Sequence, residues 1–224
     1  MNNSHKMTTI GATLLLAAAS GHAQLADKFY LDVDGGGAFQ QSVSIKNNTG
    51  FNISPPSGDI RFNTGFRTGL GAGYNFCESF AVELDAGIIH NTINTVGQYQ
   101  LSTYNANAKL DEIPLLLNAI YKFPLKGSFK PYIGAGIGGM AGIFDSSNIP
   151  FSGSGATPTY KDTDYTFAYQ AEVGFKYSLG KNMALGVAYK FIGTTDHSWN
   201  DNGITLKTDG TMPQSIEATF TWRF

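Results

Sequence analysis

The sequence predicts an all-β protein: an eight-stranded antiparallel transmembrane β-barrel with short periplasmic turns and long extracellular loops. Bulky apolar residues alternate with polar residues or glycine in segment after segment, which is the period of a β-strand. Short and long connections follow one another in turn, as in outer-membrane barrels. After residue 23 no apolar run is long enough for a membrane helix. A chain that enters lipid without helices must form a closed barrel, because lipid offers no partner for unpaired backbone groups.

Residues 1–23 have the pattern of a cleaved secretory signal peptide. They carry one early lysine, Lys6, then an apolar run over 10–19 and a small-x-small end at 21–23. The apolar run is too short to cross a bilayer as a helix. We therefore expect the mature chain to be a single barrel domain, 24–224, in the outer membrane of a Gram-negative cell. The single cysteine, Cys77, excludes an internal disulfide.

The alternating segments number eight. The clearest covers 61–76, where Phe66, Leu70 and Tyr74 share one face and Arg67 and several glycines share the other. The predicted strands cover 29–34, 61–76, 80–88, 110–123, 129–144, 165–177, 183–191 and 216–224. Three short turns join them at 75–79, 124–128 and 179–182. Four long loops, 42–59, 92–109, 145–164 and 193–212, are rich in Asn, Ser, Thr and Gly, and we expect them to be mobile and without a defined pocket. Pro114 removes a ladder donor within its strand, which predicts a bulge there or a strand that extends past its neighbour.

The apolar face is expected to contact lipid and the polar face to fill the lumen. An inverted, water-soluble barrel would have to pack roughly two dozen large apolar side chains into a lumen that eight strands leave barely wide enough to fill. On the predicted inner face seven acids match seven bases, which predicts a paired structural network instead of an ion or proton path. The acids are Asp32, Asp34, Glu83, Asp85, Glu112, Glu172 and Glu217; the bases are Arg61, Arg67, Lys122, Lys130, Lys176, Lys190 and Arg223.

Several stretches resemble the outer membrane protein beta-barrel domain family, which includes opacity-type surface proteins. They are Ile113-Pro-Leu-Leu-Leu-Asn118, Lys130-Pro-Tyr-Ile-Gly-Ala-Gly-Ile-Gly138, Ala168-Tyr-Gln-Ala171 with Gly174, and Val187-Ala-Tyr-Lys-Phe191. The closing Phe220-Thr-Trp-Arg-Phe224 resembles the terminal signal read by the barrel-assembly machinery, which assigns that role to Trp222 and Phe224. The resemblance covers the whole mature chain and implies fold and location. It carries over no catalytic or ligand-binding residue.

Two motifs invite a catalytic interpretation. Gly134, Gly136 and Gly139 have the spacing of a dinucleotide-binding loop, but they lie inside a predicted strand with no helix to follow. A lipid A-modifying enzyme would need a nucleophilic serine beside a base such as histidine. The mature chain offers only His90 at a strand end and His197 in a loop, where the adjacent Ser198 points elsewhere. Both motifs therefore favour a structural interpretation.

These observations predict a non-enzymatic outer-membrane barrel with a structural or surface-interaction role, adhesin-like or opacity-like. A narrow channel for small solutes is the first alternative, and a lipid A-modifying enzyme the second. We expect no cofactor, no metal and no catalytic residue. The expected partners are outer-membrane lipid and lipopolysaccharide, the barrel-assembly machinery, and a surface ligand bound through the long loops. A net charge of −2 gives no reason to expect nucleic acid.

Overall fold

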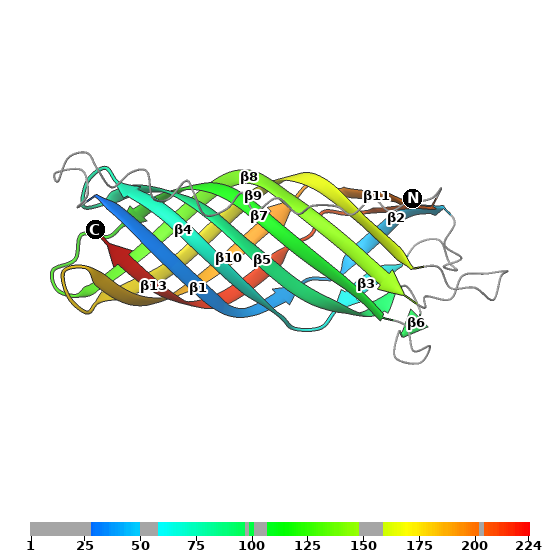
Figure 1. The fold of residues 1–224 in the computed structure, drawn as a ribbon, viewed down its shortest axis with the longest axis horizontal. Coiled ribbons are helices and arrows are strands. Elements are labelled where there is room, and N and C mark those ends of the chain that lie inside the picture. Colours follow the sequence, from blue (N-terminus) through cyan, green and yellow to red (C-terminus); the bar gives the residue numbers. More distant parts are fainter. Residues whose placement is uncertain (1–27, 50–57, 97–98, 101–106, 148–158, 202–203) are drawn as a thin grey trace, which may run out of the picture.

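The computed structural model describes residues 28–49, 58–96, 99–100, 107–147, 159–201 and 204–224. The predicted signal peptide lies outside these residues and stays a prediction. The described residues form β-strands joined by turns, and the tilted strands form a long barrel (Figure 1). None of their segments is a helix long and apolar enough to cross a membrane.

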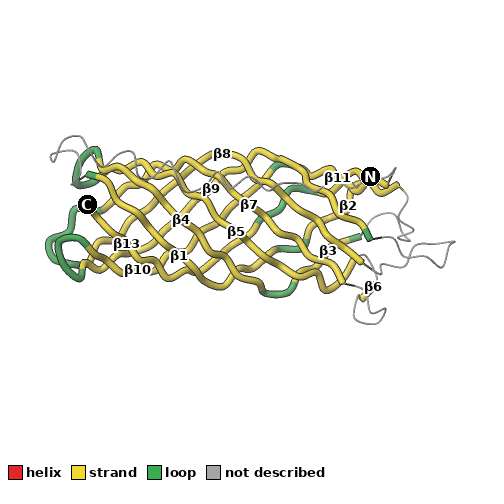
Figure 2. The backbone as a smooth tube through the Cα atoms, viewed as in Figure 1, coloured by secondary structure: helices red, strands yellow, loops and turns green. Residues whose placement is uncertain are grey.

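Eight strands close the barrel and confirm the predicted fold class. They are β1 (Phe29–Gln40), β4 (Gly65–Asn75), β5 (Phe80–Val96), β7 (Asn107–Lys122), β8 (Phe129–Ser147), β9 (Tyr160–Ser178), β10 (Met183–Thr194) and β13 (Pro213–Arg223). Each pairs antiparallel with the next, and β13 pairs back with β1, for example Val33 with Phe220. The obliquely crossing strands of Figure 2 therefore form a wall without a free edge in the membrane.

The apolar face points outward, as the alternation predicts. On β10 the side chains of Leu185 and Val187 are 49% and 41% exposed, whereas Thr219 of the neighbouring β13 faces the lumen and is 5% exposed. Aromatic rings form a continuous row around the short-turn end, from Phe29 through Tyr74 and Phe76 to Phe80. Aromatic girdles of this kind mark the membrane interface of outer-membrane barrels.

The long connections are not the unstructured loops that we expected. Their described parts contain β2 (Val43–Thr49), β3 (Asp59–Phe62), β6 (Tyr99–Gln100), β11 (His197–Asp201) and β12 (Ile204–Thr208). Strand pairing runs β5–β3–β2–β12–β11, so these strands extend the barrel wall beyond the membrane. We call this tier the crown; it consists of β2, β3, β11, β12 and the outer ends of β5, β7, β8 and β9. Strands form here because the short runs around Ile45 and Leu206 also alternate, and the expected mobility stays a prediction. The loop residues 50–57, 101–106, 148–158 and 202–203 lie outside the described part.

Two further expectations need correction. The β5–β7 ladder keeps one register on both sides of Pro114, but no residue pairs with Ile113 or Pro114 on that side. The β5–β7 ladder therefore skips the position that lacks an N–H donor and forms no bulge. On the other side of the strand, Pro114 still pairs with Met140 of β8. Arg61 lies on β3 and is exposed, so it is not a lumen residue.

Candidate functional site: a sealed lumen beneath an extracellular crown

A cluster of five charged side chains occupies the membrane part of the lumen. Arg67 donates from Nη1 to Asp34 Oδ1 at 2.9 Å and to Glu217 Oε2 at 2.7 Å, and from Nη2 to both oxygens of Asp85 at 3.0 Å. The Nζ of Lys190 lies 3.1 Å from carboxylate oxygens of Asp34 and Asp85 and 3.3 Å from Glu217. All five residues are at most 5% exposed. Two cations therefore hold three carboxylates, and each carboxylate contacts both cations.

In the lumen as a whole, buried carboxylates outnumber buried cations, whereas the sequence predicted equal numbers of the two. Lys176 pairs with Asp32, whereas Glu83 and Glu172 are buried without an ion pair among the described residues. All seven predicted lumen acids are buried, but only three of the seven bases are: Arg67, Lys176 and Lys190. Lys122, Lys130 and Arg223 line the periplasmic mouth instead. Sequence alternation assigns residues to a face but does not tell how deep in the lumen each one lies.

The glycines of β8 make room for this polar packing. A Cβ on Gly134 would lie 2.5 Å from Oε1 of Glu172, and one on Gly136 would lie 1.8 Å from Oδ1 of Asn118. Both glycines and Gly139 lie within the strand, and no helix follows them in the described residues. The dinucleotide-binding spacing is therefore a packing feature, because small residues let the carboxylate and amide side chains approach the wall.

An apolar layer seals the lumen above the charge cluster. Six side chains that are at most 2% exposed pack together there: Ala38, Ile89, Leu116, Met140, Ala168 and Ile192. Ile89 follows Asp85 on the same face of β5, and Ile192 follows Lys190 on β10. A solute moving through the described lumen would have to pass this apolar layer, which disfavours a polar path through the barrel.

A buried polar node lies above the apolar layer. Thr211 Oγ1 donates to Oε1 of Glu112 at 2.5 Å and lies 3.4 Å from Nε2 of His197. Nε2 of His197 is 3.2 Å from Thr194 Oγ1, and Nδ1 is 3.2 Å from Oδ2 of Asp164. Burial lowers the pKa of His197, although the Asp164 carboxylate opposes the shift. The Asp–His–Thr order resembles a catalytic array, but Glu112 and His197 are at most 1% exposed, so no substrate reaches them.

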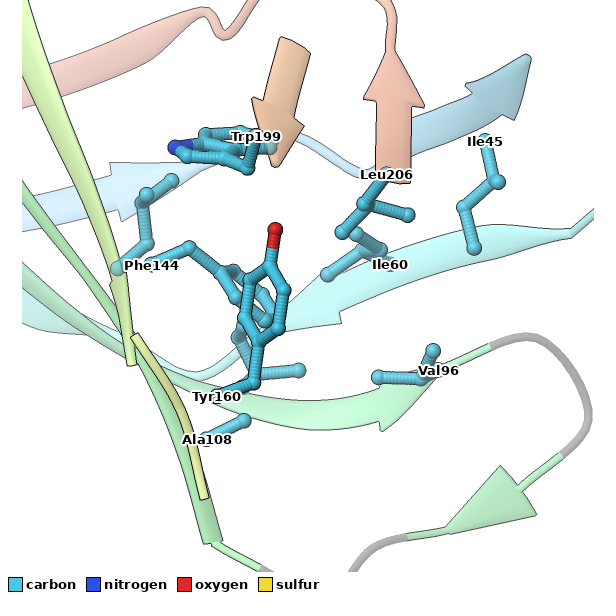
Figure 3. Close-up of a cluster of buried hydrophobic side chains, with 10 residues drawn as sticks. Ile45, Ile60, Val96, Ala108, Phe144, Tyr160, Trp199 and Leu206 are labelled. Carbon is cyan, nitrogen blue, oxygen red and sulfur yellow. The ribbon is translucent and has the colours of Figure 1, made fainter. Parts of the chain in front are cut away.

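The crown has its own apolar core. Ten buried residues from eight strands form it: Ile45, Ile60, Ile93, Val96, Ala108, Leu110, Phe144, Tyr160, Trp199 and Leu206 (Figure 3). The Trp199 ring stacks on His197 with centroids 4.7 Å apart, and its Nε1 donates to the carbonyl of Gly142 at 2.9 Å. A core of this kind holds the crown in one conformation.

Carboxylates close the crown where backbone pairing is missing. Between β11 and β9, the backbone N–H of Ser198 donates to Asp164 at 3.0 Å and that of Asn200 to Asp162 at 2.6 Å. These side chains replace ladder bonds, so β11 is attached to β9 although the two strands do not pair.

The outer wall carries a shallow groove of about 540 Å³ near His90, which corrects the expectation that this end offers no pocket. His90 Nδ1 lies 2.5 Å from Asp111 Oδ1. Within the described chain no serine or threonine side chain hydrogen-bonds to His90, so the dyad has no nucleophile beside it. Among the described residues, no group of three or more His, Cys, Asp or Glu side chains is arranged to hold a metal ion.

These features define a small outer-membrane surface protein: a closed barrel, a sealed lumen, an aromatic girdle and a crown with its own apolar core. The chain belongs to the outer membrane protein beta-barrel domain family, whose model matches residues 10–224. A candidate adhesin of Rickettsia conorii, RC1281, is 25% identical over 202 residues, which cover 85% of this chain and 74% of that protein. The outer membrane protein PagN of Salmonella typhimurium is 28% identical over 147 residues, which cover 57% of this chain and 56% of PagN.

Solved structures support the fold. The Neisserial surface protein A superposes with a TM-score of 0.51 at 18% identity, covering 88% of this chain and 97% of that one. OprG of Pseudomonas aeruginosa superposes with a TM-score of 0.54 at 16% identity, covering 90% of this chain and 99% of OprG. At these identities the likeness shows the barrel fold alone. The outer-membrane location follows from the family match.

Proposed function

We propose that the protein is a non-enzymatic, adhesin-like surface protein whose crown binds the ligand and whose barrel is the anchor. The observation that carries this proposal is the packed core of the crown. A barrel that served only as an anchor would not need a second core outside the membrane. The proposal is supported by two relatives, since RC1281 is a candidate adhesin and PagN is an outer membrane protein.

A polar stripe across three crown strands is the ligand-binding surface in this proposal. Asn47 of β2 pairs with Lys207 of β12, which pairs with Ser198 of β11. Asn47 and Lys207 are exposed, while the neighbouring Leu206 and Trp199 point into the core. A rigid sheet loses little backbone conformational entropy when its side chains bind a ligand, which favours affinity.

The test is adhesion by cells that display the protein. A non-adherent bacterial host carrying the wild-type chain should bind cultured epithelial monolayers, and Asn47→Ala/Lys207→Ala should lower the bound fraction several-fold. The matched control is Thr163→Ala/Lys161→Ala on the exposed face of β9. Equal adhesion by the stripe variant and the wild type, at equal surface amounts, would refute the stripe; no adhesion by the wild type would refute the function.

The other proposed partners concern membrane assembly. Trp222 and Phe224 are 43% and 49% exposed at the end of the chain, where the assembly machinery could reach both rings. We include them in the proposal as the assembly signal, with lipopolysaccharide and lipid around the barrel wall. The channel alternative is addressed by planar-bilayer recording, where we expect no stepwise conductance because apolar layers seal the lumen. The enzyme alternative is addressed by mass spectrometry of lipid A, where overexpression should leave acylation unchanged.

A further inference from the structure

The periplasmic mouth of the barrel contains a cavity of about 680 Å³ with a strongly positive lining. Six basic residues line it: Lys28, Lys122, Lys126, Lys130, Lys176 and Arg223. Glu78 is the one acidic residue among the described lining residues. The volume lies within the range of small-molecule sites, roughly 300–1,000 Å³.

Neutral groups hold several of these cations in place without cancelling their charge. The ammonium groups of Lys122 and Lys176 lie 4.9 and 5.1 Å from the ring centroid of the same residue, Tyr30. Lys122 also donates to the amide oxygen of Asn75, and Lys130 to the carbonyl of Leu125 at 2.5 Å. Tyrosine faces and amide oxygens attract a cation but leave its net charge available.

Carboxylate partners are scarce in this cavity. Of the six cations, Lys176 alone lies within 4.0 Å of a carboxylate of the described residues, that of Asp32. Deeper in the lumen, by contrast, Arg67 and Lys190 are each surrounded by three carboxylates. The mouth therefore attracts anions, whereas the acid-rich interior repels them, and an anion entering from the periplasm stops at the mouth.

We propose that this cavity, the periplasmic vestibule, binds small multivalent anions that carry phosphate or carboxylate groups. Its floor is formed by Tyr30 and Tyr132, and its rim by the turns around Cys77 and Leu125. Several ammonium groups converging on one anion give charge-assisted hydrogen bonds, which are stronger than neutral ones. The site lies at the opposite end from the crown, so it is independent of the proposed adhesion.

Calorimetric titration of the full chain, refolded in an uncharged detergent, tests the vestibule. Pyrophosphate and citrate are the two probes, and binding of either supports the proposal and identifies the preferred group. Lys122→Gln/Arg223→Gln should weaken binding at least about tenfold, because each substitution removes one charge-assisted contact. Raising the salt concentration should weaken it further, because Lys28 and Lys126 are exposed to solvent and are therefore screened.

The matched control is Lys46→Gln/Lys161→Gln, which removes two exposed charges at the crown end. It should bind both probes as the wild type does. A shift of electrophoretic mobility on boiling shows that each variant is folded, since a closed barrel resists detergent until it is heated. No binding of either probe by the folded wild type would overturn the proposal, as would equal losses in the vestibule variant and the control.

Discussion

The lumen within the membrane and the core of the crown solve the same packing problem with opposite chemistry. The membrane part places Arg67, Lys190 and three carboxylates at its centre, whereas the crown places Trp199, Phe144 and aliphatic side chains there. In the membrane the apolar residues are used on the outside, because lipid surrounds the wall. In the crown water surrounds the wall, so the apolar residues return to the inside, as in a soluble barrel.

This comparison shows that the solvent outside the wall decides what fills the inside. The switch occurs along single strands: β8 presents Ile133 and Ile137 to lipid at its inner part and buries Phe144 in the crown at its outer end. The two interiors should therefore respond differently to substitution. The membrane interior should depend on charge pairing, and the crown interior on shape and volume.

The largest effect is expected from Arg67→Ala. This change leaves Asp34, Asp85 and Glu217 buried with Lys190 as their remaining cation, and removal of one partner from a buried ion-pair network costs about 3–5 kcal/mol. Urea unfolding in lipid vesicles measures the loss as a lower free energy of unfolding. The control Arg61→Ala removes an exposed arginine from β3 and should change stability by at most about 0.5 kcal/mol.

Glu83 sharpens this first test, because the sequence placed it in the same paired network as Arg67. The structure gives Glu83 no ion pair among the described residues, although it is 4% exposed. Glu83→Gln should therefore lower the free energy of unfolding much less than Arg67→Ala does. If the two variants unfolded at the same urea concentration as the wild type, the lumen would be hydrated and the channel alternative would return.

The next effect concerns the crown. Trp199→Ala removes the largest side chain of the crown core. It should lower the stability of the crown by about 3–5 kcal/mol and leave the membrane part of the barrel unaffected. We expect limited proteolysis to cleave the crown faster, while the mobility shift on boiling stays unchanged. The control Trp222→Ala removes a tryptophan from the lipid-facing wall and should leave crown proteolysis as in the wild type. Loss of the mobility shift in Trp199→Ala would mean that the two interiors fold as one unit.

The eight membrane strands could be predicted from the sequence because lipid on one side and a packed lumen on the other impose strict alternation. The crown was missed for a physical reason. Its strands, such as Asp59–Phe62 and Ile204–Thr208, are four or five residues long and pair across distant segments, so no local pattern shows which strands adjoin. The depth of each charge was missed likewise, because it depends on barrel tilt and register. This is why Lys122 and Arg223 were assigned to a network and lie instead at the mouth.

A smaller effect tests the outer wall. Val187→Arg places a charge on the lipid face near the middle of β10 and should cost about 2–4 kcal/mol in bilayers. Thr219→Arg is a poor control because Oγ1 of Thr219 would lie 2.7 Å from a Cβ on Gly186, so this part of the lumen is tight. Thr163→Arg is better, since it adds the same charge to the exposed face of β9 at the crown. Equal free energies of unfolding for the two arginine variants would place Val187 in water.

The smallest effect is a pH dependence of the crown through His197. Burial lowers the pKa of this imidazole, and the nearby carboxylates of Asp164 and Asp196 oppose the shift. Its other neighbours are Thr194, Thr211 and the ring of Trp199. A histidine whose pKa is lower when folded binds more protons when unfolded, so the crown should lose stability as pH falls below the ordinary histidine value of about 6.5. The loss should stop growing once pH has passed the lowered pKa.

Trp199 reports this change directly, because its ring stacks on His197. In a Trp222→Phe background the remaining tryptophan fluorescence should shift on acidification as the crown core admits water. His197→Gln keeps a hydrogen-bonding group but cannot take up the proton, so its fluorescence should change less between neutral and mildly acidic pH. His90→Gln removes the imidazole that pairs with Asp111 on the outer wall and should behave as the parent. An unchanged acid response in His197→Gln would contradict the assignment of this response to His197.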